Sequence, residues 1–274
     1  MIGITLSSAA LVWALVASTV ACLLCLGAIV VLRTARALRV RHTEAARARV
    51  RPAVLGVLAA EEDELAEAVH QLLTLPVAQW PTAERYVLQT LSEVRGGSRD
   101  ALVRVLVDRG TLTAALRASR GRSAVRRARA AEVLGLLARP EARRRLINLT
   151  SDPSRDVRIV AVRALGSLED PTLAGIILGS LDSAGGVPAS VVGTALLRAR
   201  DADVDALRGG LTSASAPVRA TAAAVAGHLL VTDLVEPITV LLEQDPSTAV
   251  RSVARRALAR FGTDGTIDDS QVYG

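Results

Sequence analysis

The clearest pattern in the chain is a hydrophobic periodicity that recurs from about residue 120 onward. Five segments align on positions that are 31, 31, 30 and 32 residues apart. In each segment, apolar or small residues stand three, six, seven and ten positions after the alignment point, which is the spacing of one helix face. The eighth position is Gly or Ala in four of the five segments, so a neighbouring helix could approach closely there. The alignment positions are Arg127, Arg158, Ala189, Arg219 and Arg251.

A second apolar helix is expected before each of these helices. It ends near Leu149, Leu181, Leu211 or Leu242, and a polar turn such as SDPSRD or EQDPST follows it. A helix pair that cannot bury its own apolar face but recurs about every 31 residues indicates an α-solenoid. An irregular helical bundle is the alternative, but it would not keep such regular intervals. Since no alternating, strand-like run stands out, the predicted fold class is all-α.

The aligned segments resemble HEAT repeats, especially the short HEAT-like repeats of phycobilin-lyase-type proteins. The resemblance is carried by DPSRDVRIVAVRALGSL, SAPVRATAAAVAGHL and DPSTAVRSVARRALARF, with an Asp-Pro turn, then Val-Arg, then small residues at helical spacing. It covers about residues 121–262 and implies the solenoid architecture. It does not specify a function, because such repeats serve scaffolds, adaptors, lyases and nucleic-acid enzymes. The third repeat departs from the pattern with Pro188-Ala189 in place of Val-Arg, so we expect a local kink or weak joint there.

The resemblance also implies a ladder in which turn acids and Val-Arg arginines stack between neighbouring repeats. Asp152 with Arg158 matches this pattern on both sides, as does Asp245 with Arg251, whereas the two other arginines match on the arginine side alone. We expect a structural role for the whole set, not ligand binding. The predicted ladder residues are Arg127, Arg158, Arg219, Arg251, Asp152 and Asp245.

The N-terminal part of the chain is instead a continuous apolar run. Residues 1–32 include no charged side chain, and residues 9–32 would extend roughly 36 Å as a helix, enough to cross a hydrocarbon core of about 30 Å. A cleavable signal peptide would need positive charge before a shorter run. We therefore expect a transmembrane helix at 9–32 after a short external segment at 1–8. Cys22 and Cys25 lie inside the run, where small apolar packing is a more natural role than metal or redox chemistry.

The net charge of +6 is located directly after this run. Residues 33–51 hold seven arginines and one acid, whereas the chain after Arg51 holds 26 arginines and 26 acids. The positive-inside rule then puts the N-terminus outside and the main domain in the cytoplasm, so the predicted localisation is the inner (plasma) membrane with a single span. The neck arginines expected to face lipid headgroups are Arg33, Arg36, Arg39 and Arg41.

The rest of the chain is predicted to be helical as far as an acidic tail. Residues 52–119 are expected to form the N-terminal part of the solenoid, interrupted by Pro76 and by the Trp80-Pro81 pair. About five repeats fill residues 120–262. Residues 263–274 are expected to be disordered.

Little in the sequence indicates catalysis. All 33 basic residues are arginine, so neither a P-loop lysine nor a Schiff-base lysine is available. His42, His70 and His228 lack metal-ligand spacing with acids or cysteines. No Gly-x-Ser-x-Gly elbow, phosphate loop or paired-carboxylate motif is present. We therefore expect no enzyme activity, no cofactor and no metal site, and no small-molecule substrate is evident.

The predicted function is that of a membrane-anchored cytoplasmic scaffold or adaptor that binds a protein partner at the inner membrane face. Offsets two, five and nine of the aligned helices should point away from the core, and the basic residues there either receive an acidic partner segment or are only a solvated face. Nucleic-acid binding through the arginines of residues 120–145 is an alternative that the scarcity of aromatic residues disfavours. A lyase-type enzyme is a second alternative. The residues of this predicted surface, called the basic row below, are Arg129, Arg163, Arg198, His228, Arg256 and Arg260.

Overall fold

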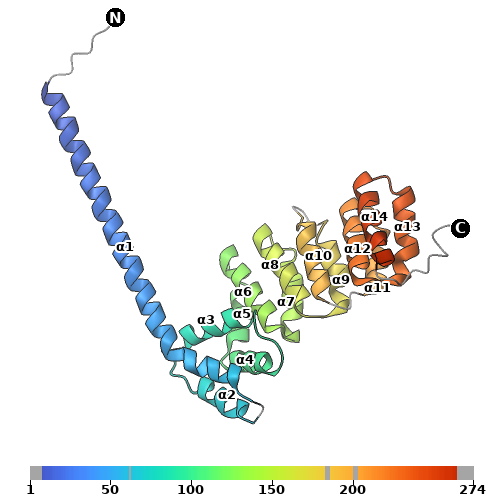
Figure 1. The fold of residues 1–274 in the computed structure, drawn as a ribbon, viewed down its shortest axis with the longest axis horizontal. Coiled ribbons are helices and arrows are strands. Elements are labelled where there is room, and N and C mark those ends of the chain that lie inside the picture. The colour runs from blue at the N-terminus through green and yellow to red at the C-terminus, as the bar shows by residue number, and fades with distance from the viewer. Residues whose placement is uncertain (1–7, 62, 183–185, 200–202, 264–274) are drawn as a thin grey trace, which may run out of the picture. The chain divides into compact units, whose positions relative to one another are not determined.

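The computed structural model describes residues 8–61, 63–182, 186–199 and 203–263, and all regular structure in these ranges is helical (Figure 1). This confirms the predicted all-α class. The chain forms two compact units, Met1–Leu102 and Val103–Gly274. Helix α4 (Gly97–Asp108) starts in the first unit and ends in the second. The predictions for residues 1–8 and for the acidic tail fall almost entirely outside the described residues.

The first unit is built on the end of one long helix. Helix α1 (Ser8–Ala59) continues through Pro52, and its last turns pack against α2 (Leu65–Leu73) and α3 (Trp80–Thr90). The side chains that α1 places in this core are fully buried and recur at helical spacing, as expected for the apolar face of a helix. They are Val50, Val54 and Val57.

The predicted membrane anchor is not supported. Within the described residues, no helix has the length and apolar character needed to cross a membrane. The apolar run at 9–32 is not a separate element, because α1 continues from it through the Arg-rich neck and into the core of the first unit without a break. The predicted single-pass inner-membrane localisation is therefore wrong. A lipid-facing role has no support for Arg33, which is exposed, or for Arg36, Arg39 and Arg41, whose side chains are outside the described set.

The second unit is a stack of helix pairs that forms two rows, as predicted for the repeats (Figure 1). One row contains the aligned helices, in which each helix contacts the next one of the row: α6 (Ala124–Leu137), α8 (Arg155–Gly166), α10 (Ala189–Arg198), α12 (Ala216–Leu229) and α14 (Thr248–Thr263). The partner row contains α5 (Thr111–Ala118), α7 (Arg143–Leu149), α9 (Ala174–Gly179), α11 (Val204–Leu211) and α13 (Val235–Gln244). Short 3₁₀ turns at Pro140–Ala142, Pro171–Leu173 and Thr232–Leu234 lead into α7, α9 and α13.

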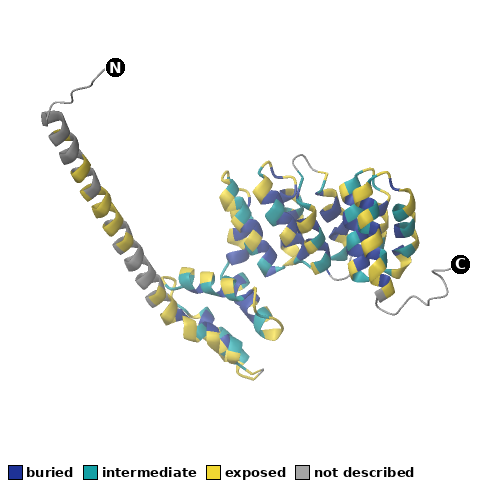
Figure 2. Cartoon of the chain, turned by 45° about the horizontal axis from the view of Figure 1, so that its top comes forward, coloured by how far each residue is buried: buried dark blue, intermediate teal, exposed yellow. Residues whose placement is uncertain are grey.

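The core of this unit lies between the two rows (Figure 2). The aligned helices supply it from the predicted offsets, with residues such as Ala161 and Leu165 of α8 and Phe261 of α14 almost completely buried. Because most of these residues are small or aliphatic, the helices pack through many short contacts and hardly any aromatic side chains.

Glycine at the eighth position sets the spacing between neighbouring aligned helices. A Cβ added at Gly135 of α6 would lie 2.6 Å from the Cβ of Ala164, and one at Gly227 of α12 would lie 2.7 Å from the Cα of Ala257. Gly166 of α8 meets α10 in the same way, at 2.7 Å from a Cα. Real side chains do not approach backbone this closely, so only glycine permits these separations. The close approach predicted from the sequence is confirmed at three of the helix contacts.

The contact between α10 and α12 lacks this arrangement. The eighth position of the third repeat is Leu197, and the residue of α12 that corresponds to Ala164 and Ala257 is Val225. A Leu-Val pair cannot reproduce a Gly-Ala separation, because both side chains occupy the space where the backbones would meet.

Candidate functional site

The turns between the two rows hold arginine–aspartate pairs that connect one repeat to the next. Arg127 of α6 donates from Nε to Oδ2 of Asp152 at 2.7 Å and from Nη2 to Oδ1 at 2.8 Å. Arg219 of α12 contacts Asp245 in the same two-pronged way, at 2.7 and 3.0 Å. Each of these arginine–aspartate pairs, called a rung below, joins an aligned helix to the turn that precedes the next aligned helix. It therefore connects two neighbouring repeats.

The arginines that follow these acids in the same repeat bind the turn backbone. Arg158 donates from Nη1 to the carbonyl oxygen of Asp152 at 2.8 Å, and Arg251 donates to that of Asp245 at 2.5 Å. Each turn is also closed by its own aspartate, since Oδ1 of Asp152 accepts a hydrogen bond from the backbone N–H of Ser154 at 2.9 Å. The carboxylate therefore belongs to the arginine of the preceding repeat, and the arginine of its own repeat holds the turn carbonyl.

These aspartates are buried and stay ionised because of their partners. The residues Asp152 and Asp245 are 8% and 5% exposed. The hydrogen bonds from Arg127 hold the pKa of Asp152 below its ordinary value, and those from Arg219 do the same for the pKa of Asp245. In return, the carboxylates raise the pKa of both arginines. A hydrogen-bonded, ionised pair of this kind is stable in a buried position, whereas either charge alone would be costly.

The rung between the third and fourth repeats cannot form from the residues present. Position 189, where the other repeats carry arginine, is alanine, and Ser213 stands where the turns before α8 and α14 carry aspartate. The turn is held by two hydrogen bonds. Oγ of Ser213 accepts one from the backbone N–H of Ser215 at 3.2 Å, and Nη1 of Arg219 donates the other to the Ser213 carbonyl oxygen at 2.8 Å. The turn backbone is therefore in place, but the arginine at position 189 and the aspartate at position 213 that would form the ion pair are missing.

This gap gives a direct test of the rung. The double substitution Ala189→Arg with Ser213→Asp should raise the free energy of unfolding by about 1 kcal/mol, the upper end for an ion pair that is not fully buried. Urea denaturation followed by circular dichroism at 222 nm measures the change. Each single substitution is the control, and a double variant no more stable than the sum of the singles would contradict the assignment.

Two further inter-repeat contacts were not predicted from the sequence. Arg143 pairs with Asp170 at 2.8 Å and donates to Oγ1 of Thr172 at 2.8 Å, and Arg145 donates to Oγ of Ser119 at 2.8 Å. Neither arginine recurs, since Ala174 and Ile176 stand one period later. Because these arginines do not recur, the periodicity does not reveal their contacts. The Asp-Pro-Thr sequence at 170–172 is nevertheless a recognisable helix-start signal.

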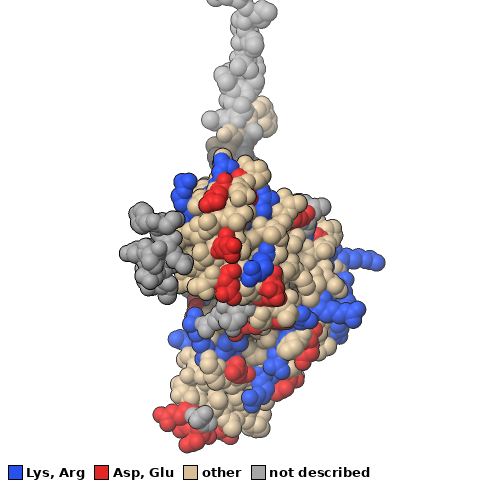
Figure 3. All heavy atoms as spheres, turned by 90° about the vertical axis from the view of Figure 1, so that its right-hand side faces the viewer, with Lys and Arg blue, Asp and Glu red and all other residues tan. Residues whose placement is uncertain are grey.

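All residues of the basic row are exposed, as their offsets require. Arg163 of α8 and Arg198 of α10 lie together at one surface pocket. Arg260 of α14 is hydrogen-bonded through Nη1 to Nδ1 of His228 on α12, at 2.9 Å. Arg129 is separate from these two pairs along the row, on α6. Figure 3, which faces the α13–α14 end, shows basic and acidic side chains side by side there, in keeping with the equal numbers of arginines and acids after Arg51.

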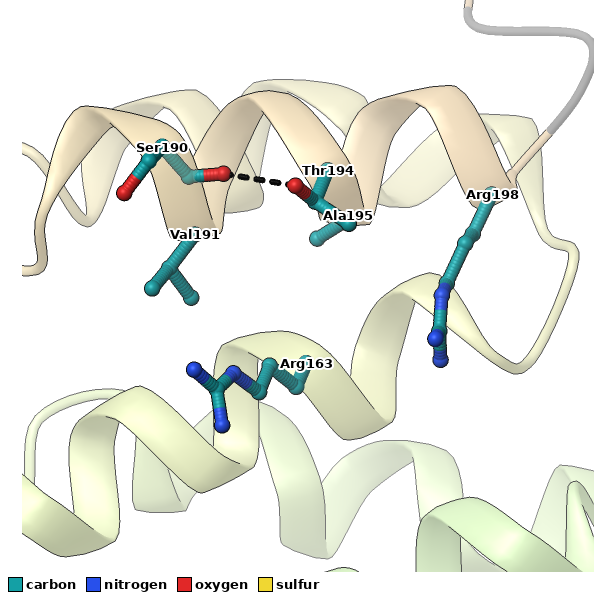
Figure 4. Close-up of a pocket in the computed structure, with 6 residues that line it drawn as sticks. All are labelled: Arg163, Ser190, Val191, Thr194, Ala195 and Arg198. Atoms are coloured by element: carbon teal, nitrogen blue, oxygen red, sulfur yellow. Dashed lines mark hydrogen bonds between the residues drawn. The ribbon is translucent and has the colours of Figure 1, made fainter. Parts of the chain in front are cut away.

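The pocket lies between α8 and α10 and has a volume of about 350 Å³ (Figure 4). Val191 and Ala195, which are 8% and 1% exposed, give it an apolar floor. Thr194 lines it too, but its hydroxyl donates to the Ser190 carbonyl at 2.7 Å. In Figure 4 the guanidinium groups of the two arginines lie at different sides of the space in front of this floor. The arrangement can hold anionic groups. Within the described ranges, no cluster of His, Cys, Asp and Glu could hold a metal ion.

Comparison with known proteins bears on one part of the chain. No curated protein matches the sequence. A crystal structure of an engineered protein is 18% identical, covering 79% of this chain and 98% of its own, but its TM-score of 0.26 is too low to bear on fold or function. Residues 110–189 match the family model for HEAT repeats. The finer resemblance to phycobilin-lyase-type proteins stays a prediction. Residues 110–189 are therefore similar to HEAT repeats in sequence, and their helices form pairs.

Proposed function

We propose that the second unit is a protein-binding scaffold whose basic row receives an acidic segment of a partner protein. An α-solenoid supplies a long, regular surface and is stabilised from repeat to repeat. Its side chains can therefore be spaced for a linear partner without a closed active site. We assign no catalytic step to it.

The observation that carries the proposal is the difference between two classes of arginine on the same helices. On α6, the side chain of Arg127 is 13% exposed and forms a two-pronged pair with Asp152. Arg129 of the same helix is exposed and has no side-chain partner among the described residues. Arg163 and Arg198 are exposed and without a side-chain partner in the described ranges as well. A guanidinium has five N–H donors in a planar fork that matches a carboxylate. These three arginines therefore offer donors to a partner.

Nucleic-acid binding is less well supported by the same geometry. Several arginines of the 120–145 segment are already engaged: Arg127 with Asp152, Arg143 with Asp170 and Arg145 with Ser119. The pKa of Arg145 is lowered mainly by burial and secondly by the positive charge of Arg120. Arginines held in internal contacts are not free to neutralise phosphates.

Charge reversal at the two ends of the row tests the proposal. The variant Arg129→Glu with Arg256→Glu should bind the partner at least about tenfold more weakly, because two attractive contacts become repulsive. Raising the salt from about 0.1 M to about 1 M should weaken wild-type binding as well, because the Debye length falls from about 10 Å to about 3 Å. The measurement is the Kd of the partner recovered by affinity capture on the full chain and then purified.

The matched control is Arg155→Glu with Arg255→Glu, which changes the charge equally at exposed positions of α8 and α14 outside the row. Helical circular dichroism and Tm should stay the same in both variants. If the row variant keeps the wild-type Kd, or if the control loses as much affinity, the row is a solvated face and the proposal fails.

A further inference from the structure

The pocket between α8 and α10 has the shape of a short groove along one face of α10. Its lining residues on that helix run from Ser190 to Arg198, a length of about 12 Å at the rise of an α-helix. Val191, Thr194 and Ala195 lie between these ends at helical spacing, and Arg163 faces them from α8 (Figure 4). A groove of this length is suited to a stretch of side chains more than to a single small ion.

The chemistry of the groove alternates between charge and apolar surface. Arg163 and Arg198 present guanidinium groups at different sides of it, and Val191 and Ala195 form the floor between them. The Thr194 hydroxyl proton is committed to the Ser190 carbonyl, so it does not contribute a donor to a ligand. A free phosphate would gain little from the floor. An acidic side chain at each guanidinium, with an apolar side chain between them, would use every part of the groove.

We propose that this groove is the specificity site of the basic row and that it binds a glutamate–apolar–glutamate stretch of the partner's acidic segment. This inference rests on the proposed function. The rest of the row attracts the acidic segment through charge, and the groove selects the sequence by receiving one apolar side chain on Val191 and Ala195 while the flanking carboxylates pair with Arg163 and Arg198. Surface charge pairs are individually weak, so the apolar contact supplies the discrimination that charge alone lacks.

Direct binding to short synthetic peptides tests the inference. The probe is a fluorescein-labelled peptide with one leucine flanked by glutamates, and its Kd for the full chain is measured by fluorescence anisotropy. The variant Arg163→Gln with Arg198→Gln should weaken binding about tenfold, given the usual strength of two exposed charge pairs. Arg155→Gln with Arg255→Gln, which removes the same charge elsewhere, should leave the Kd unchanged. Replacing the leucine of the peptide with serine should also weaken binding, and replacing its glutamates with glutamine should abolish it.

A variant that fills the groove without changing charge separates this inference from the proposed function. Thr194→Trp is on an exposed position and should block the peptide while leaving helical circular dichroism intact. If Thr194→Trp binds like wild type, or if the serine peptide binds as well as the leucine peptide, the groove is not a specificity site. In that case loss of the partner in Arg129→Glu with Arg256→Glu would still support the scaffold, whereas no loss in any of these variants would overturn both. Self-association through the chain's own acidic stretch at 61–67 would appear as a mass that rises with concentration and would overturn the assignment to a separate partner.

Discussion

Replacing Gly227 with leucine should lower the free energy of unfolding of the chain by about 3 kcal/mol, the upper end for overpacking a close contact. A Cβ at this position would lie 2.7 Å from both the Cα and the Cβ of Ala257 and 3.0 Å from its carbonyl oxygen. Because two of these atoms are backbone, no rotamer change can relieve the clash, and α12 and α14 must move apart. The midpoint of urea denaturation, followed at 222 nm, measures the loss.

The matched control is Gly193→Ala on α10, where an added Cβ meets nothing within 4 Å. Alanine is favoured over glycine in a helix interior by about 0.5–1 kcal/mol, so this variant should be slightly more stable than wild type. A Gly227→Leu protein with an unchanged midpoint would mean that glycine does not set the spacing of these helices.

Removing the carboxylate of the last rung should have the second largest effect. Asp245→Asn keeps the shape of the side chain but should cost about 2 kcal/mol at pH 7, because a buried charge-assisted hydrogen bond is lost and a guanidinium of Arg219 is left facing a neutral group. Asp156→Asn, on an exposed position of α8, is the control and should change the free energy of unfolding by less than about 0.5 kcal/mol. Equal losses in the two variants would show that the rung has no special role.

The same rungs should make the chain less stable in acid. The pKa values of Asp152 and Asp245 are lowered in the folded state, so their stabilising contribution is complete above the unfolded value of about 3.9. It is lost as the pH falls below that value towards the lowered folded pKa, since the unfolded chain takes up protons first. The variant Asp152→Asn with Asp245→Asn should show a flatter dependence of Tm on pH below about pH 4 than wild type. An unchanged acid dependence would contradict these rungs as its source.

The sequence contained enough information for the helices and their spacing but not for the partners of the rungs. Periodicity shows which positions face the core, and a recurring glycine such as Gly135 shows where helices approach. It does not show whether an arginine reaches its own turn or the next one, because both distances are consistent with the same period. In the structure Arg127 of the preceding repeat binds the carboxylate of Asp152, and Arg158 binds the backbone carbonyl of that aspartate.

Two other features cannot be predicted from the sequence alone. The groove depends on which residues are neighbours in space, and the length of α1 depends on the continuity of the helix backbone. The groove forms only when Arg163 of α8 and Arg198 of α10 come side by side, although both positions were singled out separately by their offsets. The apolar run at 9–32 predicts an independent span because it is long enough to cross a membrane and contains no charged side chain. Composition does not show that one helix continues across such a boundary, as α1 does.

The joint between the third and fourth repeats combines three features: Leu197 instead of glycine, Ala189 instead of arginine, and Ser213 where the turns before α8 and α14 carry aspartate. In a linear stack each repeat is coupled only to its neighbours, so a weakly coupled joint divides the stack into two cooperative blocks. One block ends with α10 and the other begins with α11. Amide hydrogens next to this joint should exchange through a local opening that leaves both blocks intact, and a cut there should yield two pieces that keep their helices.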